Sequence, residues 1–585
     1  MTHKIEWLHK YYIIIMLMIL TAILMFSNIN KLPLWHDEAS TVVLSTNTLK
    51  YGYPRVWDGR NIALHSIAEY TSGYAFSNNT WLHYYICAAS IALFGQSNLS
   101  VRLPFVLFGI ATVFIVWKIS FFLFKRNRIA DLTAALLTVY VPFLLYAKQA
   151  RYYSISMFLI AVSAYLYLMV NDNQPKRNRK VTWLIISLLF LFLTNIVAFA
   201  TMIGALCLHI IFQRKLLNVK IFILMIFAGV FIIVSLWFLP EQFSISRYIP
   251  ARLLVVFWKI QVYFVPILSL GIVLSIISMV HYFITKEQFT LFTSYDLFFP
   301  LLILSNMTLV IIPEQNILNH YFLGVVVAVP FVMTSVILYS KRISRTIAAI
   351  LLLLTVGSNV LNVVPYYLIR TNEFEPNKAT QFNTVGSPPH LTPYNFYDRL
   401  YDVPGNKLYP ELPGPILHGI ISSPYTMADC LILPLNQYCN EKLSFESHLI
   451  KYMKEITGEY INAPMEITKL LQKYGNTSEK IYINTIEYEY ILLNTDMQVV
   501  NRFQFDQDSI LAKLTIVSDD EIDWFIVTDE KYVSGLHDPE YLIKNRTLFT
   551  QYKISTKDIL NTPDLDLHQF ETTYEGKDLI ILHRN

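Results

Sequence analysis

Long apolar runs separated by short polar segments dominate the chain. A helix needs about 20 apolar residues to cross the hydrocarbon core of a membrane, and a window of about 19 residues finds about eleven such runs. They lie near residues 11–28, 102–124, 130–147, 152–170, 181–194, 196–213, 219–239, 261–284, 295–312, 320–340 and 345–365. The two short runs on either side of Asn195 are the least clearly divided. The pattern predicts a mainly α fold, a polytopic bundle of transmembrane helices.

The first loop between spans, residues 29–101, is too long to be a turn. It holds an apolar helical run from Trp81 to Gly95. At about 14 residues this run is shorter than a span, which favours a helix in the membrane interface or against the bundle. We therefore expect residues 1–365 to form a transmembrane domain that includes this loop.

Beyond Tyr366 the chain becomes polar, and prolines crowd residues 388–415. Strand-like runs follow at 430–435, 480–494, 524–528 and 579–582, and a helical pattern covers 447–474 with an interruption near Pro464. Strands that alternate with helix predict a compact α/β domain over residues 366–585.

Lys and Arg mark every second loop. They occur before the first span and again at 125–128, 176–180, 214–215, 286 and 341–345. Since cytoplasmic loops carry the excess of basic residues, these loops and the N-terminus are predicted to be cytoplasmic. Loop 29–101 and the residues beyond Tyr366 are then extracytoplasmic, in a multi-pass protein of the cell (inner or plasma) membrane.

Composition supports a membrane protein, because 54% of the residues are hydrophobic and only 15% are charged. The net charge of +4 is spread over loops, which argues against a nucleic-acid partner. The four cysteines show no CxxC pair and no zinc spacing. Cys430 and Cys439 share the predicted outer domain and could form a disulfide, which their spacing does not decide.

The first candidate for chemistry is the adjacent pair Asp37 and Glu38, which follows the first span. Ionisable groups near membrane depth usually face a cavity and mark a site. The alternative is that the pair stabilises the N-terminus of a short helix over 39–48, where acidic residues are favourable. The pair alone does not decide between these interpretations.

A second candidate lies between the third and fourth spans, where Lys148, Arg151 and Tyr152 occupy a short turn. Two cations on the predicted outer side depart from the charge rule. Arg151 could extend to lipid headgroups, or it could bind a phosphate with its planar guanidinium. His320 and Tyr321 open the tenth span on the same predicted side, where a tyrosine is also an ordinary interfacial residue.

Four segments in one order resemble the GT-C superfamily of integral-membrane glycosyltransferases, especially protein O-mannosyltransferases and lipid A aminoarabinose transferases. They are Trp-His-Asp-Glu-Ala at 35–39, Tyr-Gly-Tyr-Pro at 51–54, the stretch 93–104 that ends in Val-Arg-Leu-Pro, and Gln-Ala-Arg-Tyr at 149–152. The resemblance covers about the first 210 residues well. It implies that Asp37 is the catalytic base with Glu38 in support.

The same resemblance implies that Arg151, with Tyr152, contacts the phosphate of a lipid-linked donor. Relatives often carry Arg-Tyr at the late span, whereas this chain has His320 and Tyr321, so a second phosphate contact stays open. Relatives also carry Lys-Pro-Pro or His-Pro-Pro in the first outer loop. Here His83 could take part of that role in contacting donor or acceptor, as could Lys148, or His83 is an ordinary interfacial histidine.

The expected reaction moves a sugar from a polyprenyl-phosphate donor to an acceptor hydroxyl on the outer face, with inversion. The acceptor could be a lipid, a glycan or a protein. The sequence assigns no definite cofactor, and a divalent metal could bridge Asp37 and the phosphate. The main alternative is a transporter or flippase for a lipid-linked glycan, whose usual signs are broken helices with mid-membrane charges and internal repeats. A membrane scaffold would leave Asp37 and Arg151 without a role.

Overall fold

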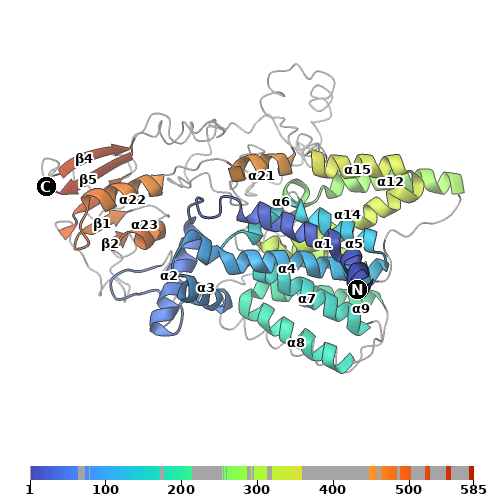
Figure 1. Ribbon diagram of the computed structural model, residues 1–585, viewed down its shortest axis with the longest axis horizontal. Helices are drawn as coiled ribbons and strands as arrows, with labels where there is room; N and C mark the ends of the chain where they lie inside the picture. The colour runs from blue at the N-terminus through green and yellow to red at the C-terminus, as the bar shows by residue number, and fades with distance from the viewer. Residues whose placement is uncertain are drawn as a thin grey trace, which may run out of the picture. The chain divides into compact units, whose positions relative to one another are not determined.

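The computed structural model describes most of the helical region and the main part of the C-terminal domain (Figure 1). The described residues are 2–63, 71–171 except 72 and 78, 177–213, 253, 256–257, 260–285, 292, 295–312, 319–358, 361, 447–457, 463–483, 488–501, 521–527, 549–554 and 579–584. The predicted span at 219–239, the domain boundary at 365/366, the proline-rich entry, the predicted strand at 430–435 and the pair Cys430 and Cys439 lie outside these residues. Contacts divide the chain into two compact units, residues 1–27, 105–376 and 392–456 in one and residues 28–104, 377–391 and 457–585 in the other.

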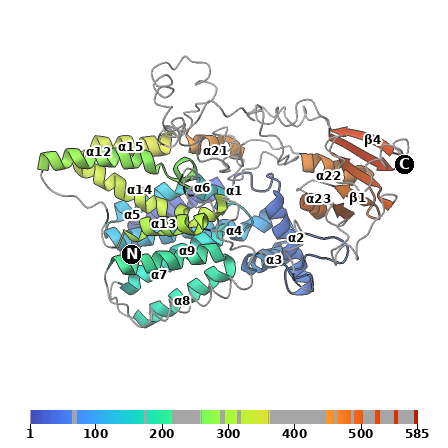
Figure 2. The ribbon, with the colours of Figure 1, turned by 180° about the vertical axis from the view of Figure 1, so that it is seen from behind.

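The first unit is helical. Its elements are α1 (Thr2–Phe26), most of α4 (Asn98–Phe124), α5 (Asn127–Thr138), α6 (Val141–Ala147), α7 (Tyr153–Asn171), α8 (Arg177–Thr194), α9 (Ile196–Phe212), η3 (Ile260–Phe264), α12 (Ile267–Thr285), α13 (Phe298–Ile311), η4 (Asn319–Phe322), α14 (Leu323–Ile343), α15 (Arg345–Gly357) and α21 (His448–Thr457). Helices α7, α8 and α9 lie side by side in both views (Figures 1 and 2). Helix α14 is almost entirely buried and packs on α5, α7, α13 and α15.

Three described helices are long and apolar enough to cross a membrane, at Asn98–Phe124, Tyr153–Val170 and Leu323–Ile343. Six shorter apolar helices accompany them, at Tyr11–Phe26, Leu82–Phe94, Ile196–Phe212, Ser269–Tyr282, Phe298–Ile311 and Arg345–Gly357. The prediction of a mainly helical membrane protein is confirmed. The count of eleven spans stays a prediction.

The span that the sequence predicts at 130–147 is broken in the structure, although the two helices together are long and apolar enough to cross a membrane. Helices α5 and α6 are separate and meet at an angle of 64°. Pro142 stands in the first turn of α6, where its missing N–H costs nothing, but the same ring would disrupt a continuous helix. The division at Asn195 is confirmed, because the Asn195 side chain accepts a hydrogen bond of 2.7 Å from the backbone N–H of Ala198 and caps α9.

Close helix contacts fix the region where α14 begins. A Cβ atom on Gly204 would lie 2.3 Å from Oγ of Ser305, so a larger residue there would displace the Ser305 hydroxyl from between α9 and α13. Beside it, the Asn306 amide donates to the backbone oxygen of Tyr321 at 2.9 Å and accepts from the N–H of Val325 at 3.2 Å. One buried side chain thus sets the geometry of η4, the short helix that carries His320 and Tyr321.

The second unit combines the loop at 29–101, which the sequence predicts to be extracytoplasmic, with the C-terminal α/β domain. The loop supplies α2 (His36–Tyr51) and α3 (Leu82–Phe94), and the domain supplies α22 (Ala463–Tyr474), α23 (Tyr488–Asn494), β1 (Lys480–Ile483), β2 (Gln498–Asn501), β3 (Trp524–Val527), β4 (Phe549–Ile554) and β5 (Leu579–Arg584). The strands form one sheet in the order β2-β1-β3-β5-β4. Strand β1 is parallel to β2 and β3, and β5 is antiparallel to β3 and β4.

The predicted C-terminal elements are confirmed in part. Strands at 480–483, 524–527 and 579–584 and the interrupted helical pair α21 and α22 match the sequence prediction. The long strand predicted over 480–494 is wrong, because residues 488–494 form helix α23. Ile491 and Leu492, adjacent in sequence, both pack on the same core cluster with Leu471 and Trp524, which a strand could not achieve since its side chains alternate between faces.

Candidate functional site

Asp37 lies in the first turn of α2. The helix begins at His36 after an extended Trp35, so the pair does not occupy the N-cap position that the alternative interpretation would give it. Both carboxylates instead stand within the first turn, where the helix dipole favours negative charge. Asp37 is half-buried, and its backbone oxygen accepts a hydrogen bond of 2.9 Å from Oγ1 of Thr41. The side chain is held on a rigid element with its carboxylate at the start of a helix.

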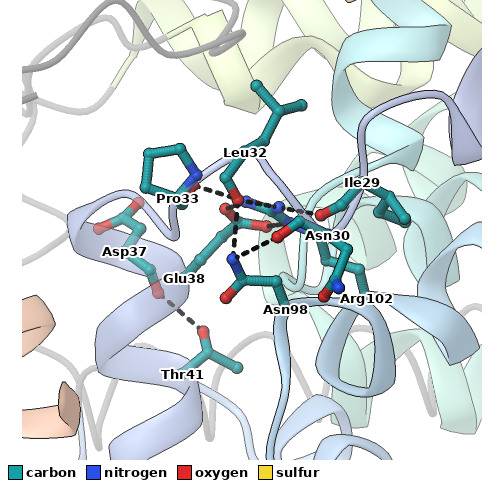
Figure 3. A network of polar contacts seen from close by, with 9 residues as sticks. All are labelled: Ile29, Asn30, Leu32, Pro33, Asp37, Glu38, Thr41, Asn98 and Arg102. Carbon is teal, nitrogen blue, oxygen red and sulfur yellow. Dashed lines mark hydrogen bonds and ion pairs between the residues drawn. The ribbon is translucent and has the colours of Figure 1, made fainter. Parts of the chain in front are cut away.

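Glu38 has a different environment from its neighbour. It is 1% exposed and forms an ion pair with Arg102, whose Nε and Nη2 donate to the two carboxylate oxygens at 2.8 and 2.5 Å. Two parallel bonds of this kind are the strongest geometry that a guanidinium and a carboxylate adopt. Figure 3 shows the Glu38 carboxylate turned to Arg102, whereas the Asp37 carboxylate points away from that pair.

Arg102 also holds the loop before α2. Its Nη1 donates to the backbone oxygens of Ile29 and Leu32 at 2.8 and 2.7 Å, and its Nη2 donates to that of Pro33 at 2.9 Å (Figure 3). Five N–H donors therefore make five hydrogen bonds, the full capacity of a guanidinium. The pair joins the loop at 29–33, the first turn of α2 and the start of α4 into one buried unit.

The sequence alone assigns no role to Arg102, although the residue lies in the Val-Arg-Leu-Pro segment that resembles the GT-C superfamily. The available signal was its position at the mouth of an apolar span, where an unpaired cation is costly. Its partner carboxylate, 64 residues earlier in the chain, is visible only in the folded structure.

The turn between α6 and α7 carries the second candidate group. Arg151 is 7% and Lys148 is 4% exposed. A cation that extended to lipid headgroups would leave its charged end on the protein surface, so burial of Arg151 argues against that interpretation. The guanidinium lies 5.5 Å from the ring centroid of Tyr152, and Lys148 Nζ donates to the backbone oxygen of Ser27 at 2.7 Å. Lys148 thus fastens the turn to the end of α1.

Gln149 is a polar residue of the same turn to which the sequence pattern assigns no role. Its side chain is 4% exposed, and within the described part of the chain neither Oε1 nor Nε2 has a hydrogen-bond partner. Buried Oγ atoms of Ser154 and Ser156 nearby in sequence have none there either. Burying an amide without partners costs about 1–3 kcal/mol, so such groups in a native structure call for a ligand or water.

The remaining predicted residues lie elsewhere in their units. His83 is completely buried in α3, with its ring 3.9 Å from that of Tyr84, which differs from the interfacial histidine that the sequence suggested. His320 and Tyr321 lie in η4, and Tyr321 is half-buried.

A two-carboxylate metal site at Asp37 and Glu38 does not fit, because both oxygens of Glu38 accept hydrogen bonds from Arg102. Among the described residues no group of three or more His, Cys, Asp or Glu side chains is arranged to hold a metal ion.

Comparison with known proteins shows which proteins the chain is similar to. Residues 78–238 match the family model described as dolichyl-phosphate-mannose-protein mannosyltransferase. Among solved structures, ArnT from Cupriavidus metallidurans bound to undecaprenyl phosphate is similar with a TM-score of 0.51 and 11% identity over 98% of each chain. The apo state of ArnT gives 0.51 and 12% over 97% of each chain. The Archaeoglobus fulgidus oligosaccharyltransferase in complex with Zn and sulfate gives 0.43 and 10% over 93% of this chain and 72% of that one. A comparison with curated proteins found no match.

The chain is thus an integral-membrane protein with the fold of the GT-C superfamily of glycosyltransferases. The resemblance inferred from the sequence is confirmed at this level, and the matched model includes the turn that carries Arg151.

Proposed function

We propose that the protein transfers a sugar from a polyprenyl-phosphate donor to an acceptor hydroxyl on the extracytoplasmic face of the membrane, with inversion at the anomeric carbon. The observation that carries this proposal is the buried turn at 148–151. The turn holds a buried guanidinium and, two residues earlier, an amide that lacks partners in the described chain. Such groups suit a phosphate ester, which accepts bidentate hydrogen bonds from arginine. The likeness to ArnT bound to undecaprenyl phosphate supports a lipid-linked donor of this kind.

In the proposed reaction, Arg151 stabilises the negative charge that develops on the departing polyprenyl phosphate. Asp37 accepts the proton of the acceptor hydroxyl while that oxygen attacks the anomeric carbon from the side opposite the phosphate. The bond from the anomeric carbon to the acceptor oxygen forms as the bond to the phosphate oxygen breaks. Glu38 supports Asp37 through Arg102, which fixes the first turn of α2.

Candidate contacts to the donor are Tyr152, Lys148, His320 and Tyr321, and His83 is a candidate for donor or acceptor. Lys148, whose Nζ donates to the backbone oxygen of Ser27, lies in the same turn as Arg151. The sugar could be a hexose or a pentose, and the acceptor a lipid, a glycan or a protein. A divalent metal on Asp37 would need ligands other than Glu38.

The alternative function is a transporter or flippase for a lipid-linked glycan. The break between α5 and α6 is the kind of discontinuous helix that transporters use. Asp37 lies in the first turn of α2 and Arg151 in the turn before α7, so neither stands in the middle of a helix, which favours the transferase.

Arg151 should matter through donor affinity more than through folding. Arg151→Lys keeps the charge but loses the bidentate geometry, so polyprenyl phosphate should bind about 10- to 100-fold more weakly, the worth of one charge-assisted hydrogen bond. Titration of the purified protein with polyprenyl phosphate measures this. Arg126→Lys, an exposed cation in a different loop, is the matched control and should bind normally. Normal affinity in Arg151→Ala would remove Arg151 from the donor site.

The predicted orientation can be tested by cysteine labelling in a cysteine-free background. Lys469→Cys, exposed on α22, should react with a membrane-impermeant maleimide in intact cells, because the C-terminal domain is predicted to be extracytoplasmic. Arg126→Cys, exposed in a predicted cytoplasmic loop, should react only after permeabilisation. The reverse pattern would invert the assigned sidedness and place the reaction in the cytoplasm.

A further inference from the structure

The first outer loop makes a contact with the C-terminal domain that no catalytic role explains. Asn61 is 8% exposed, and its Oδ1 accepts a hydrogen bond of 2.8 Å from the N–H of Val499 in β2. Its Nδ2 donates to the backbone oxygen of Met497 at 3.4 Å. Strand β2 is at the edge of the sheet, so its outer backbone groups need a partner. One side-chain amide here satisfies the edge as a neighbouring strand would.

The loop that presents Asn61 is rigid. Oδ1 of Asp58 accepts hydrogen bonds from the backbone N–H groups of Arg60 and Asn61 at 2.7 and 2.6 Å, an Asx turn. The backbone oxygen of Asp58 accepts in turn from the Tyr51 hydroxyl at 2.6 Å and from Lys50 Nζ at 2.9 Å. Because Lys50 and Tyr51 are the last residues of α2, the turn is fastened to the helix whose first turn carries Asp37.

Arg60 adds a second attachment. Its Nη1 donates to the backbone oxygen of Asp496 at 2.6 Å, and its Nη2 donates to that of Thr477. These carbonyls belong to the turns that lead into β2 and β1. Two neighbouring loop residues therefore hold two turns of the sheet as well as its edge.

Helix α23 of the same domain packs directly on α2, and Figure 2 shows the two helices next to each other. One part of α23 belongs to the domain core through Ile491 and Leu492. Tyr490 of α23 interacts electrostatically with Arg102. Burial raises the pKa of the Tyr490 hydroxyl, and the positive charge of Arg102 partly offsets that rise. Glu489, in the first turn of α23, is completely buried. Helix α2 is thus contacted at its end by the Asn61 turn and also by α23.

We propose that Asn61 is a positioning residue that couples the C-terminal domain to helix α2 and thereby fixes the orientation of Asp37. In this role the C-terminal domain holds the loop at 29–101, which carries Asp37, and does not need to bind substrate. The kinetic consequence rests on the proposed function of Asp37, whereas the structural coupling does not. The two can therefore be tested separately.

The variant Asn61→Leu keeps the side-chain size but leaves the N–H of Val499 without a partner. Amide hydrogen exchange of the purified full chain should then accelerate about tenfold in β2 and also across His36–Tyr51. In the transfer assay kcat should fall roughly 10- to 100-fold, the cost of a displaced catalytic group, with an unchanged KM for the donor. Asn61→Asp keeps the acceptor for Val499 and should restore most of both properties.

Lys480→Gln is the control, because it removes an exposed ion pair with Glu521 in the same sheet and should leave α2 unchanged. Should Asn61→Leu fail to fold, Arg60→Gln weakens the exposed half of the same contact and should accelerate exchange in α2 to a smaller extent. Faster exchange in β2 with wild-type exchange in α2 would overturn the proposal. Faster exchange in α2 in a protein that shows no transferase activity would support the coupling and count against the proposed function alone.

Discussion

The variant Asp37→Asn should transfer sugar about 10²–10⁴ times more slowly than the wild type, which is the usual contribution of a general base. Asparagine has nearly the size and hydrogen-bonding capacity of aspartate but cannot accept the proton of the acceptor hydroxyl. Donor affinity should change little, because the phosphate is assigned to Arg151. Turnover and donor binding, measured on the same purified protein, separate the two roles.

The structure predicts that Asp37→Asn folds normally. The hydrogen bond from Thr41 goes to the backbone oxygen of Asp37, which the substitution leaves in place. The interaction of the charge with the helix dipole is lost, about 0.3–1 kcal/mol. Asp131→Asn, whose amide oxygen can still accept from Trp117, is the matched control and should keep wild-type turnover. Full activity in Asp37→Asn would remove the residue from the chemistry and leave it a stabiliser of α2.

Glu38→Gln should act on stability, with a loss of about 3–5 kcal/mol, because it breaks a buried ion pair and leaves the charge of Arg102 without compensation. A lower melting temperature and a lower yield of folded protein are the expected results. Turnover per folded molecule should fall less than in Asp37→Asn. If Glu38 were the base, turnover per folded molecule would fall in Glu38→Gln at least as far as in Asp37→Asn.

A double-mutant cycle isolates the pair. Arg102→Met should be destabilising, because it also removes the hydrogen bonds that Arg102 donates to the loop at 29–33. The backbone oxygen of Leu32 still accepts from Asn98 Nδ2 at 3.1 Å. The double variant Glu38→Leu/Arg102→Met should lose less stability than the sum of the single losses, since neither charge is then buried alone. Additive losses would show that the pair does not act as a unit.

The helical elements were largely readable from the sequence because apolar runs of about 20 residues have few alternatives to a membrane helix. Asn195 marked a helix start because its side chain caps α9. The bend between α5 and α6, next to Pro142, was not predicted. Hydropathy averages over a window and does not register the N–H that proline lacks. Residues 488–494 were misread as strand because their aromatic and branched side chains suit both structures, and only packing on the sheet decides.

For the candidate site, the sequence indicated which residues to examine but gave Asp37 and Glu38 similar environments. The structure separates them, because Arg102 pairs with Glu38 and not with Asp37 in the described contacts (Figure 3). That pairing depends on a contact between α2 and α4, and no local pattern encodes it. A role for Gln149 could not be predicted from the sequence either. An amide carries no charge, and its lack of partners is a property of the folded chain.

The most direct measurement of the central claim is transfer of labelled sugar by the purified protein, supplied in detergent with a panel of polyprenyl-phosphate sugars and hydroxyl acceptors, for wild type and Asp37→Asn in parallel. The account predicts that the wild type releases polyprenyl phosphate from at least one donor, gives a product of inverted anomeric configuration, and loses about 10²–10⁴ of its rate in Asp37→Asn. No transfer from any donor, together with movement of a donor across proteoliposome membranes, would contradict it in favour of a flippase.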